Sequence, residues 1–202
     1  MSSESIPAPW AGIPAGAPGD SGRRHAWVGW LAAACCAAIV VTMIVFQERY
    51  RVGETWLASE VVSGVLGQHT FPLPGRPVMY FQTSASPGIM GIIVSLACSS
   101  VLLVAPLFAI SGAMFLSTAR SRGRVVLATL VAFVIIAVAN NIRLTLIVAL
   151  AGRFGKTGLD WGHVLIGSLV MLAAGGAAIL VYLRIMTGHR PRRRRKEEAV
   201  EG

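Results

Sequence analysis

Three residues with reactive or charged side chains interrupt otherwise apolar parts of this sequence. Cys98 lies in SLACSS, inside a segment without charged or histidine residues from Pro77 to Ala119. Arg143 lies in VANNIRLTLIV, and His163 lies near the start of another apolar stretch. An imidazole that takes the proton of a thiol creates a nucleophile able to attack a peptide carbonyl. A guanidinium donates hydrogen bonds to the resulting oxyanion, and its charge favours the thiolate. The three residue types therefore indicate cysteine catalysis, provided that the fold brings them together.

Two further polar residues are candidates for supporting roles. Asn140 precedes Arg143 by one helical turn, so it can orient the arginine or add a hydrogen-bond donor. Asp160 lies three residues before His163 and can fix its tautomer, although a helix-capping role is the stronger interpretation. Taken alone, Arg143 is equally compatible with a side chain that snorkels to the membrane surface. These assignments therefore depend on where the helices place the residues.

The other cysteines and histidines have simpler interpretations. Cys35 and Cys36 are adjacent, lie in an apolar stretch and lack Cys-x-x-Cys spacing, so we expect them to pack rather than form a disulfide. His25, His69 and His189 lie in basic or loop segments and are expected to be solvated. The sequence has no cluster with metal-ligand spacing and no glycine-rich phosphate loop. It therefore predicts neither a metal nor a cofactor.

Long apolar stretches must position the candidate residues. Of the 202 residues, 54% are hydrophobic and 13% are charged. Four runs approach or exceed the ~20 residues needed to cross a hydrocarbon layer of ~30 Å. They cover residues 26–46, about 88–117, 125–150 and 161–186. We therefore predict an all-α integral membrane protein, with a bundle of four transmembrane helices.

The first apolar run is expected to remain in the protein as a membrane helix. A cleaved secretory signal is the competing interpretation of the first apolar run, but that run is about twice as long as a signal core and lacks a small-x-small site. Between the first two runs we expect a short interfacial helix, followed by a turn or small hairpin over FPLPGRPVMYFQT. The expected organisation therefore has five parts: a disordered cytoplasmic tail (1–25), transmembrane helix 1 (26–46), an extracytoplasmic segment (47–87), a catalytic core of three transmembrane helices (88–186) and a basic cytoplasmic tail (187–202).

The basic residues predict the orientation of the chain. The formal net charge is +9, and the arginines and lysines gather before the first helix, in the loop 120–124 and from residue 184 onward. This bias places both termini in the cytoplasm, with the protein in the plasma membrane and the candidate site near its extracytoplasmic face. The terminal run HRPRRRRK is best interpreted as an anchor at anionic lipid, and nucleic acid is not an expected partner.

Counting the helical rise from the cytoplasmic arginines predicts a common depth for the candidate residues. At ~1.5 Å per residue, Cys98 and His163 lie ~33 and ~32 Å from the cytoplasmic end of their helices, and Arg143 lies ~28 Å from it. The three positions agree to roughly 5 Å before helix tilt is considered. We therefore expect the three side chains to share a layer near the outer surface.

The order and context of these residues resemble the exosortase/archaeosortase family of membrane-embedded cysteine transpeptidases. In that family, a Cys in an A-C-S-G-like context, an Arg in an N-x-x-R context and a downstream His or Arg lie on successive helices near the outer face. The resemblance covers about residues 88–186. Ser100 departs from the pattern, because the family usually has Gly after Cys-Ser, and this puts the detailed packing in question. The matching segments are Ala97-Cys98-Ser99, Asn140-Asn141-Ile142-Arg143 and Gly162-His163.

The resemblance implies specific roles and partners. Cys98 would be the nucleophile, Arg143 the oxyanion stabiliser and His163 the base. The substrate would be a secreted protein whose carboxy-terminal sorting signal has a short motif, a transmembrane helix and a basic tail. The enzyme would cut near the outer face and pass the acyl chain to an amine or to water. A non-enzymatic membrane protein, such as a transporter subunit or assembly factor, is the alternative, with Arg143 binding a ligand or partner helix.

Overall fold

The computed structural model describes residues 20–82, 88–117 and 121–188. The predicted basic tail and most of the predicted amino-terminal tail therefore lie outside the described residues. The helices are α1 (Asp20–Val45), α2 (Gln47–Leu66), α3 (Val101–Leu116), α4 (Arg122–Trp161) and α5 (Gly167–Thr187). The strands are β1 (Thr70–Pro72), β2 (Val78–Gln82) and β3 (Ile89–Ile93), and the short turns are the 3-10 turn η1 (Leu96–Cys98) and the π-helical turn η2 (Gly162–Ile166).

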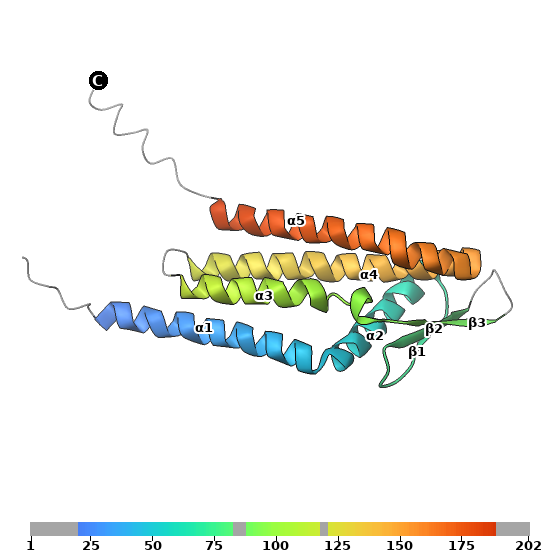
Figure 1. Ribbon diagram of the computed structural model, residues 1–202, viewed down its shortest axis with the longest axis horizontal. Helices are drawn as coiled ribbons and strands as arrows, with labels where there is room; N and C mark the ends of the chain where they lie inside the picture. Colours follow the sequence, from blue (N-terminus) through green and yellow to red (C-terminus); the bar gives the residue numbers. More distant parts are fainter. Residues whose placement is uncertain (1–19, 83–87, 118–120, 189–202) are drawn as a thin grey trace, which may run out of the picture.

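Four helices form an elongated bundle. Figure 1 shows α1, α3, α4 and α5 lying lengthwise beside one another, with α3 packed against α1 and α4. Their common core consists mainly of buried small and branched side chains, such as Val104, Ala128 and Ala132. Inside this core the Ser111 hydroxyl lies 2.6 Å from that of Thr129, which joins α3 to α4. Most of the bundle is therefore held by close apolar packing, because helices in contact over small residues approach closely.

The chain reverses direction within α4. Gly155 has φ 61° and ψ −138°, a conformation that interrupts the helix and that residues with a Cβ rarely adopt. Beyond it, Gly158 lies against the Leu150 carbonyl and Gly162 lies against Ile147. Residues later in the chain thus meet earlier ones, as in an antiparallel helix pair. The link between the predicted runs 125–150 and 161–186 is therefore a tight reversal at one glycine, with helix on both sides.

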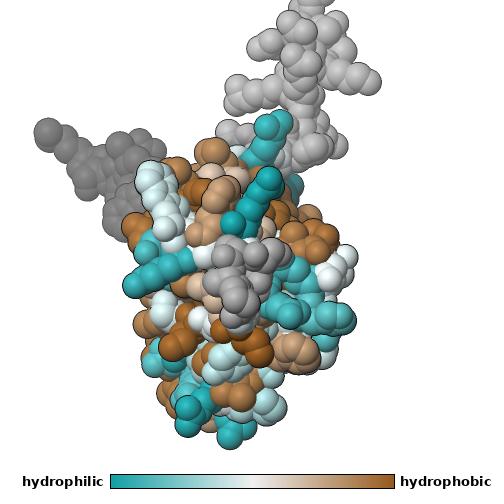
Figure 2. All heavy atoms as spheres, turned by 90° about the vertical axis from the view of Figure 1, so that its right-hand side faces the viewer, coloured by the Kyte–Doolittle hydropathy of each residue, from teal (hydrophilic) through white to brown (hydrophobic). Residues whose placement is uncertain are grey.

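A small antiparallel sheet lies beside α2 at one end of the bundle (Figure 1). The strand order is β1-β2-β3, and Gly75 in the β1–β2 turn has a positive φ of 74°. Met79 and Phe81 of β2 are almost completely buried, in a second core with Val62 of α2 and Ile147 of α4. Figure 2 views the molecule from this end, where hydrophilic and hydrophobic residues are interspersed. The sheet is thus anchored to the bundle through one apolar face.

The structure corrects part of the sequence interpretation. The chain is mostly helical, as predicted, but a third strand joins the predicted hairpin, so that residues 70–93 contain a three-stranded sheet. The helix expected over about 88–117 begins only at Val101, because Ile89–Ile93 pairs with β2 and the following residues form η1. The short helix after the first apolar run and the hairpin were predicted correctly, although α2 begins at Gln47.

Two stretches are long and apolar enough to cross a membrane. Within the described residues they are Trp27–Val45 in α1 and Arg122–Thr187, which includes α4, η2 and α5. The α3 helix is equally apolar but has 16 residues. Many large apolar side chains on these helices are exposed, including Leu31, Leu130 and Leu172. Such surfaces suit lipid, because a helix that is apolar all round is stable only where no water contacts it.

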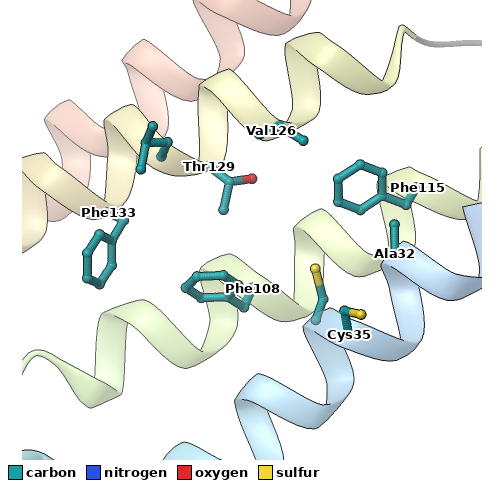
Figure 3. A pocket seen from close by; sticks show the side chains of 9 residues that line it. Ala32, Cys35, Phe108, Phe115, Val126, Thr129 and Phe133 are labelled. Atoms are coloured by element: carbon teal, nitrogen blue, oxygen red, sulfur yellow. The ribbon is translucent and has the colours of Figure 1, made fainter.

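An apolar cavity of 310 Å³ lies between α1, α3 and α4 (Figure 3). Cys35 and Phe108 are among the side chains that line it, and Thr129 contributes a hydroxyl. Cys35, Cys36 and Cys98 are all free thiols, so the structure has no disulfide among them. Neither Arg143 nor His163 lines this cavity, and the chemistry suggested by the sequence lies elsewhere.

Candidate active site

Cys98 lies on the short turn that connects the sheet to α3. The turn η1 (Leu96–Cys98) follows β3, and the Cys98 N–H donates to the Ser95 carbonyl at 3.0 Å. Ser99 then has an extended backbone, and α3 begins two residues later. The Cys98 side chain is fully buried, with 0% of its surface exposed. The cysteine is therefore fixed by a turn above α3 rather than by the helix itself.

His163 faces the thiol. The Cys98 Sγ lies 3.1 Å from His163 Nδ1 and 3.6 Å from Nε2. His163 belongs to η2, a single turn of π-helix in front of α5, and such turns often occur at functional sites. At this separation the imidazole can accept the thiol proton directly. The structure thus joins two residues that are 65 positions apart in sequence.

Arg143, on α4, contacts the cysteine turn. Its Nη1 donates to the Ala97 carbonyl at 3.0 Å, and its Nη2 lies 3.7 Å from the Cys98 Sγ. Only 4% of the arginine is exposed, and its Nε has no partner within the described part of the chain. A Cβ at Gly167 would lie 2.7 Å from that Nε, so this glycine makes room for the guanidinium. Arg143 is therefore enclosed by protein rather than extended to the membrane surface.

Glu54, on α2, holds the residues that follow the cysteine. One carboxylate oxygen accepts from the Ser99 hydroxyl at 2.5 Å. The other accepts from the backbone N–H and the hydroxyl of Ser100, at 3.0 and 2.7 Å, and from Asn140 Nδ2 at 2.9 Å. Hydrogen bonds to a carboxylate are stronger than those between neutral groups. Glu54 therefore fastens the cysteine turn to both α2 and α4.

The sequence analysis did not identify Glu54 as part of the site. A glutamate on a short amphipathic helix is normally solvated, and the sequence gives Glu54 such a position. The available signal was its neighbourhood: Thr55, Ala58, Ser59 and Val62 form a small-residue stripe at helical spacing, and all four are buried. Glu54 borders this stripe, which faces the bundle.

Ser100 uses its hydroxyl twice. It donates to Glu54, so the Tyr50 hydroxyl, 2.8 Å away, is the donor in the second contact. A tyrosine hydroxyl is protonated at neutral pH and can donate, and burial raises the pKa of Tyr50 further above its ordinary value. The Ser that departs from the family pattern is therefore accommodated, because its added hydroxyl is bonded to two residues of α2.

The two predicted supporting residues are placed differently from each other. Asn140 is buried, but its amide donates to Glu54 rather than orienting Arg143. Asp160 is exposed, and among the described residues it forms no hydrogen bond with His163 or with the end of a helix. His69 is likewise exposed, and the contacts of the Cys98 sulfur are with His163 and Arg143. Asn140 thus joins the site through Glu54, whereas nothing in the structure assigns Asp160 a part in it.

Comparison with known proteins places the chain in a family. The family model described as transmembrane exosortase matches residues 21–181, which is more than half of the chain. The chain belongs to the transmembrane exosortase family. No curated protein and no solved structure matches it.

Membership of the exosortase family extends over more of the chain than the short motifs suggested. The matched residues include α1, α2 and the sheet in addition to the helices that carry Cys98, Arg143 and His163. Exosortases are membrane-embedded cysteine transpeptidases, and this member has the apolar helices expected of a membrane protein. The helix that supplies Glu54 therefore lies within the part of the chain that matches the family.

Proposed function

We propose that this exosortase cleaves carboxy-terminal sorting signals of secreted proteins near the outer membrane face, using Cys98, Arg143 and His163. The observation that carries the proposal is the 3.1 Å contact between the Cys98 Sγ and His163 Nδ1, with Arg143 Nη2 3.7 Å from the same sulfur. A base on one side of a thiol and a fixed cation on the other favour the thiolate, which is the reactive form.

In the proposed mechanism His163 accepts the Cys98 proton as the sulfur attacks the scissile carbonyl. The carbonyl oxygen becomes an oxyanion, to which the Arg143 guanidinium donates hydrogen bonds. When the C–N bond breaks, His163 returns the proton to the leaving amine, which departs with the substrate's helix and basic tail. An amine or water then attacks the thioester, His163 takes its proton, and the thiol is restored.

Arg143 is suited to this role because its neighbours hold it in place. The Ala97 carbonyl binds Nη1, and Gly167 leaves space beside Nε. A donor that is already oriented needs no rearrangement as charge develops, and it acts strongly where water is excluded. Nη2 points at the sulfur, beside which the oxyanion would form.

The membrane topology is part of the same proposal. We place four helical segments across the plasma membrane: α1, α3, the part of α4 before Gly155, and α5. Both termini then lie in the cytoplasm. This orientation puts α2, the sheet and the cysteine turn at the extracytoplasmic end, where Figure 1 shows them together. A peptide bond just outside a substrate's own transmembrane helix would then lie at the depth of Cys98.

The experiment uses a tail reporter: a secreted protein that ends in a variable short segment, a hydrophobic helix of ~20 residues and an arginine cluster. Reporters processed in cells with the wild-type exosortase are selected from a library of segments, and processing is compared with that in Cys98→Ala cells. The proposal expects processing that depends on Cys98. Full processing by a correctly inserted Cys98→Ala variant would instead support the non-enzymatic alternative, in which Arg143 binds a partner and Cys98 packs.

A further inference from the structure

The third strand of the sheet has an unpaired edge. Among the residues that the structure describes, the strand order β1-β2-β3 leaves β3 with a neighbour on one side only. The Val94 N–H donates to the Pro77 carbonyl at 2.8 Å, which fixes which residues face β2. Because backbone groups in an antiparallel strand alternate in direction, those of Ile89, Gly91 and Ile93 point away from β2. Outside the sheet's own ladder, no hydrogen bond between described residues involves these three.

The opposite edge of the sheet is protected. Strand β1 carries Pro72, which has no N–H to offer, and the Thr70 hydroxyl is bonded to Ser59 and Ser63 of α2 at 2.7 and 2.8 Å. Proline and a covering helix are common ways to prevent an edge from pairing with another chain. The difference between the two edges indicates that pairing at β3 serves a purpose.

The free edge leads directly to the candidate nucleophile. Ile93 ends β3, Val94 still pairs with the sheet, and η1 then carries Cys98. Two extended residues and a 3-10 turn span at most ~13 Å, which is the length of roughly three to four residues of an extended peptide. A peptide lying along β3 therefore reaches the Cys98 sulfur within a few residues.

We propose that the free edge of β3 binds the substrate segment that precedes the scissile bond, as an added fourth strand. The inference rests on the proposed function. In that function the substrate runs from outside toward the membrane, and β3 likewise runs toward Cys98 from the outer end of the molecule (Figure 1). The added strand is therefore parallel to β3, and the sheet becomes mixed.

In this mode of binding, different groups of the strand determine how tightly a substrate segment binds and which segment is preferred. Main-chain hydrogen bonds from Ile89, Gly91 and Ile93 hold any extended segment, and the side chains of alternate residues decide which segment is preferred. Ile89 and Ile93 lie on the same face of the strand and are 72% and 66% exposed. Substrate side chains on that face would contact these isoleucines, so the edge favours apolar residues at alternate positions upstream of the cleaved bond.

The first test removes a backbone N–H at the free edge of β3 and leaves the hydrogen bonds between β2 and β3 in place. Ile93→Pro removes an N–H that points away from β2, whereas Ile93→Val keeps the N–H and the branched side chain. With a tail reporter that the wild type processes and Cys98→Ala does not, Ile93→Pro is expected to lower processing about tenfold or more. Ile93→Val is expected to stay within about twofold of wild type. Equal processing by the proline variant would overturn the inference and leave the proposed function standing.

The second test does not require activity and covers the case in which Ile93→Pro misfolds. In the Cys98→Ala background, Ile93→Cys is oxidised with tail reporters that carry a single cysteine at successive positions of the variable segment. Strand pairing predicts disulfides at alternate positions. Moving the enzyme cysteine to Ile89 should shift the bonded reporter position by four residues toward the reporter's amino terminus, because the strands are parallel.

Other crosslinking results would contradict the inference in distinct ways. A shift toward the carboxyl terminus would show the opposite strand direction. Bonding at every position with equal yield would show an unpaired segment. A disulfide between two copies of the exosortase, formed without reporter and lost on dilution, would show that β3 pairs with a second copy. If no library member is processed by the wild type, the proposed function fails and the edge inference fails with it.

Discussion

Glu54 holds Ser100, two residues after Cys98, through both the backbone N–H and the hydroxyl of the serine. The two bonds measure 3.0 and 2.7 Å and end on the same carboxylate oxygen. This contact ties α2 to the start of α3, and a bond from Asn140 to the same carboxylate extends it to α4. The position of the thiol is thereby set by an element that carries none of the proposed catalytic residues.

Replacing Glu54 is expected to lower activity through the position of Cys98. Glu54→Gln keeps the shape of the side chain but loses the charge-assisted bonds, each worth about 1.5–3 kcal/mol. Reporter processing should fall about 10- to 100-fold. Glu60→Gln, at an exposed position of the same helix, is the matched control and should process normally. Equal rates for the two variants would show that Glu54 has no positioning role.

Arg143→Lys tests whether the site needs the planar guanidinium group or only its positive charge. A lysine ammonium cannot contact the Ala97 carbonyl and the Cys98 sulfur in the same planar arrangement. Processing should fall about 100-fold, comparable to the loss of one oxyanion donor. The control is Arg153→Lys, at an exposed position on the same helix. A lysine variant with wild-type activity would contradict the role given to Nη1 and Nη2.

Two glycines of α5 offer a matched pair. A Cβ at Gly167 would lie 2.7 Å from Arg143 Nε, whereas a Cβ at Gly176 would meet nothing within 4 Å. Gly167→Ala should therefore displace the arginine and abolish most processing. Gly176→Ala should process normally and gain about 0.5–1 kcal/mol in helix stability, measured by thermal unfolding in detergent. Normal processing by Gly167→Ala would show that the guanidinium tolerates movement.

Ser100→Gly restores the residue that the family usually has. It removes the hydroxyl bonds to Glu54 and Tyr50 but keeps the backbone N–H that donates to Glu54. We expect a loss of about 2–4.5 kcal/mol in unfolding free energy, from one bond to a carboxylate at about 1.5–3 kcal/mol and one neutral bond at about 0.5–1.5 kcal/mol. Processing should stay within a few-fold of wild type. A large loss of activity with unchanged stability would show that the serine hydroxyl takes part in the chemistry.

The sequence was sufficient for the long helices, because apolar runs of ~20 residues are a strong signal. It was also sufficient for the family, because the contexts and the order of Cys98, Arg143 and His163 carry the resemblance. It was insufficient for residues 88–100. The segment Ile89–Ile93 lies in an uninterrupted apolar run, and apolarity alone does not distinguish a buried strand from a helix. Its β-branched residues beside Gly88 and Gly91 were the available sign of a strand.

The depth estimate assumed that Cys98 lies on a continuous helix, and that assumption was wrong. The estimate nevertheless placed Cys98 near His163, because only two residues, Ser99 and Ser100, lie between the cysteine and the start of α3. A turn and a helix differ by only a few ångströms over so short a distance. Glu54 could not be found in this way, since its importance depends on contacts between α2 and residues far away in the sequence.

The central claim is that Cys98 forms a covalent bond with the substrate, and mass spectrometry of the purified exosortase tests it most directly. The enzyme is incubated in detergent with a selected tail reporter and no added amine, then digested and mapped. The account predicts a hydroxylamine-sensitive thioester on Cys98 that carries the amino-terminal part of the reporter, weakened in His163→Ala and absent in Cys98→Ala. Continued processing by Cys98→Ala, or an adduct on Cys35 or Cys36 instead, would contradict it.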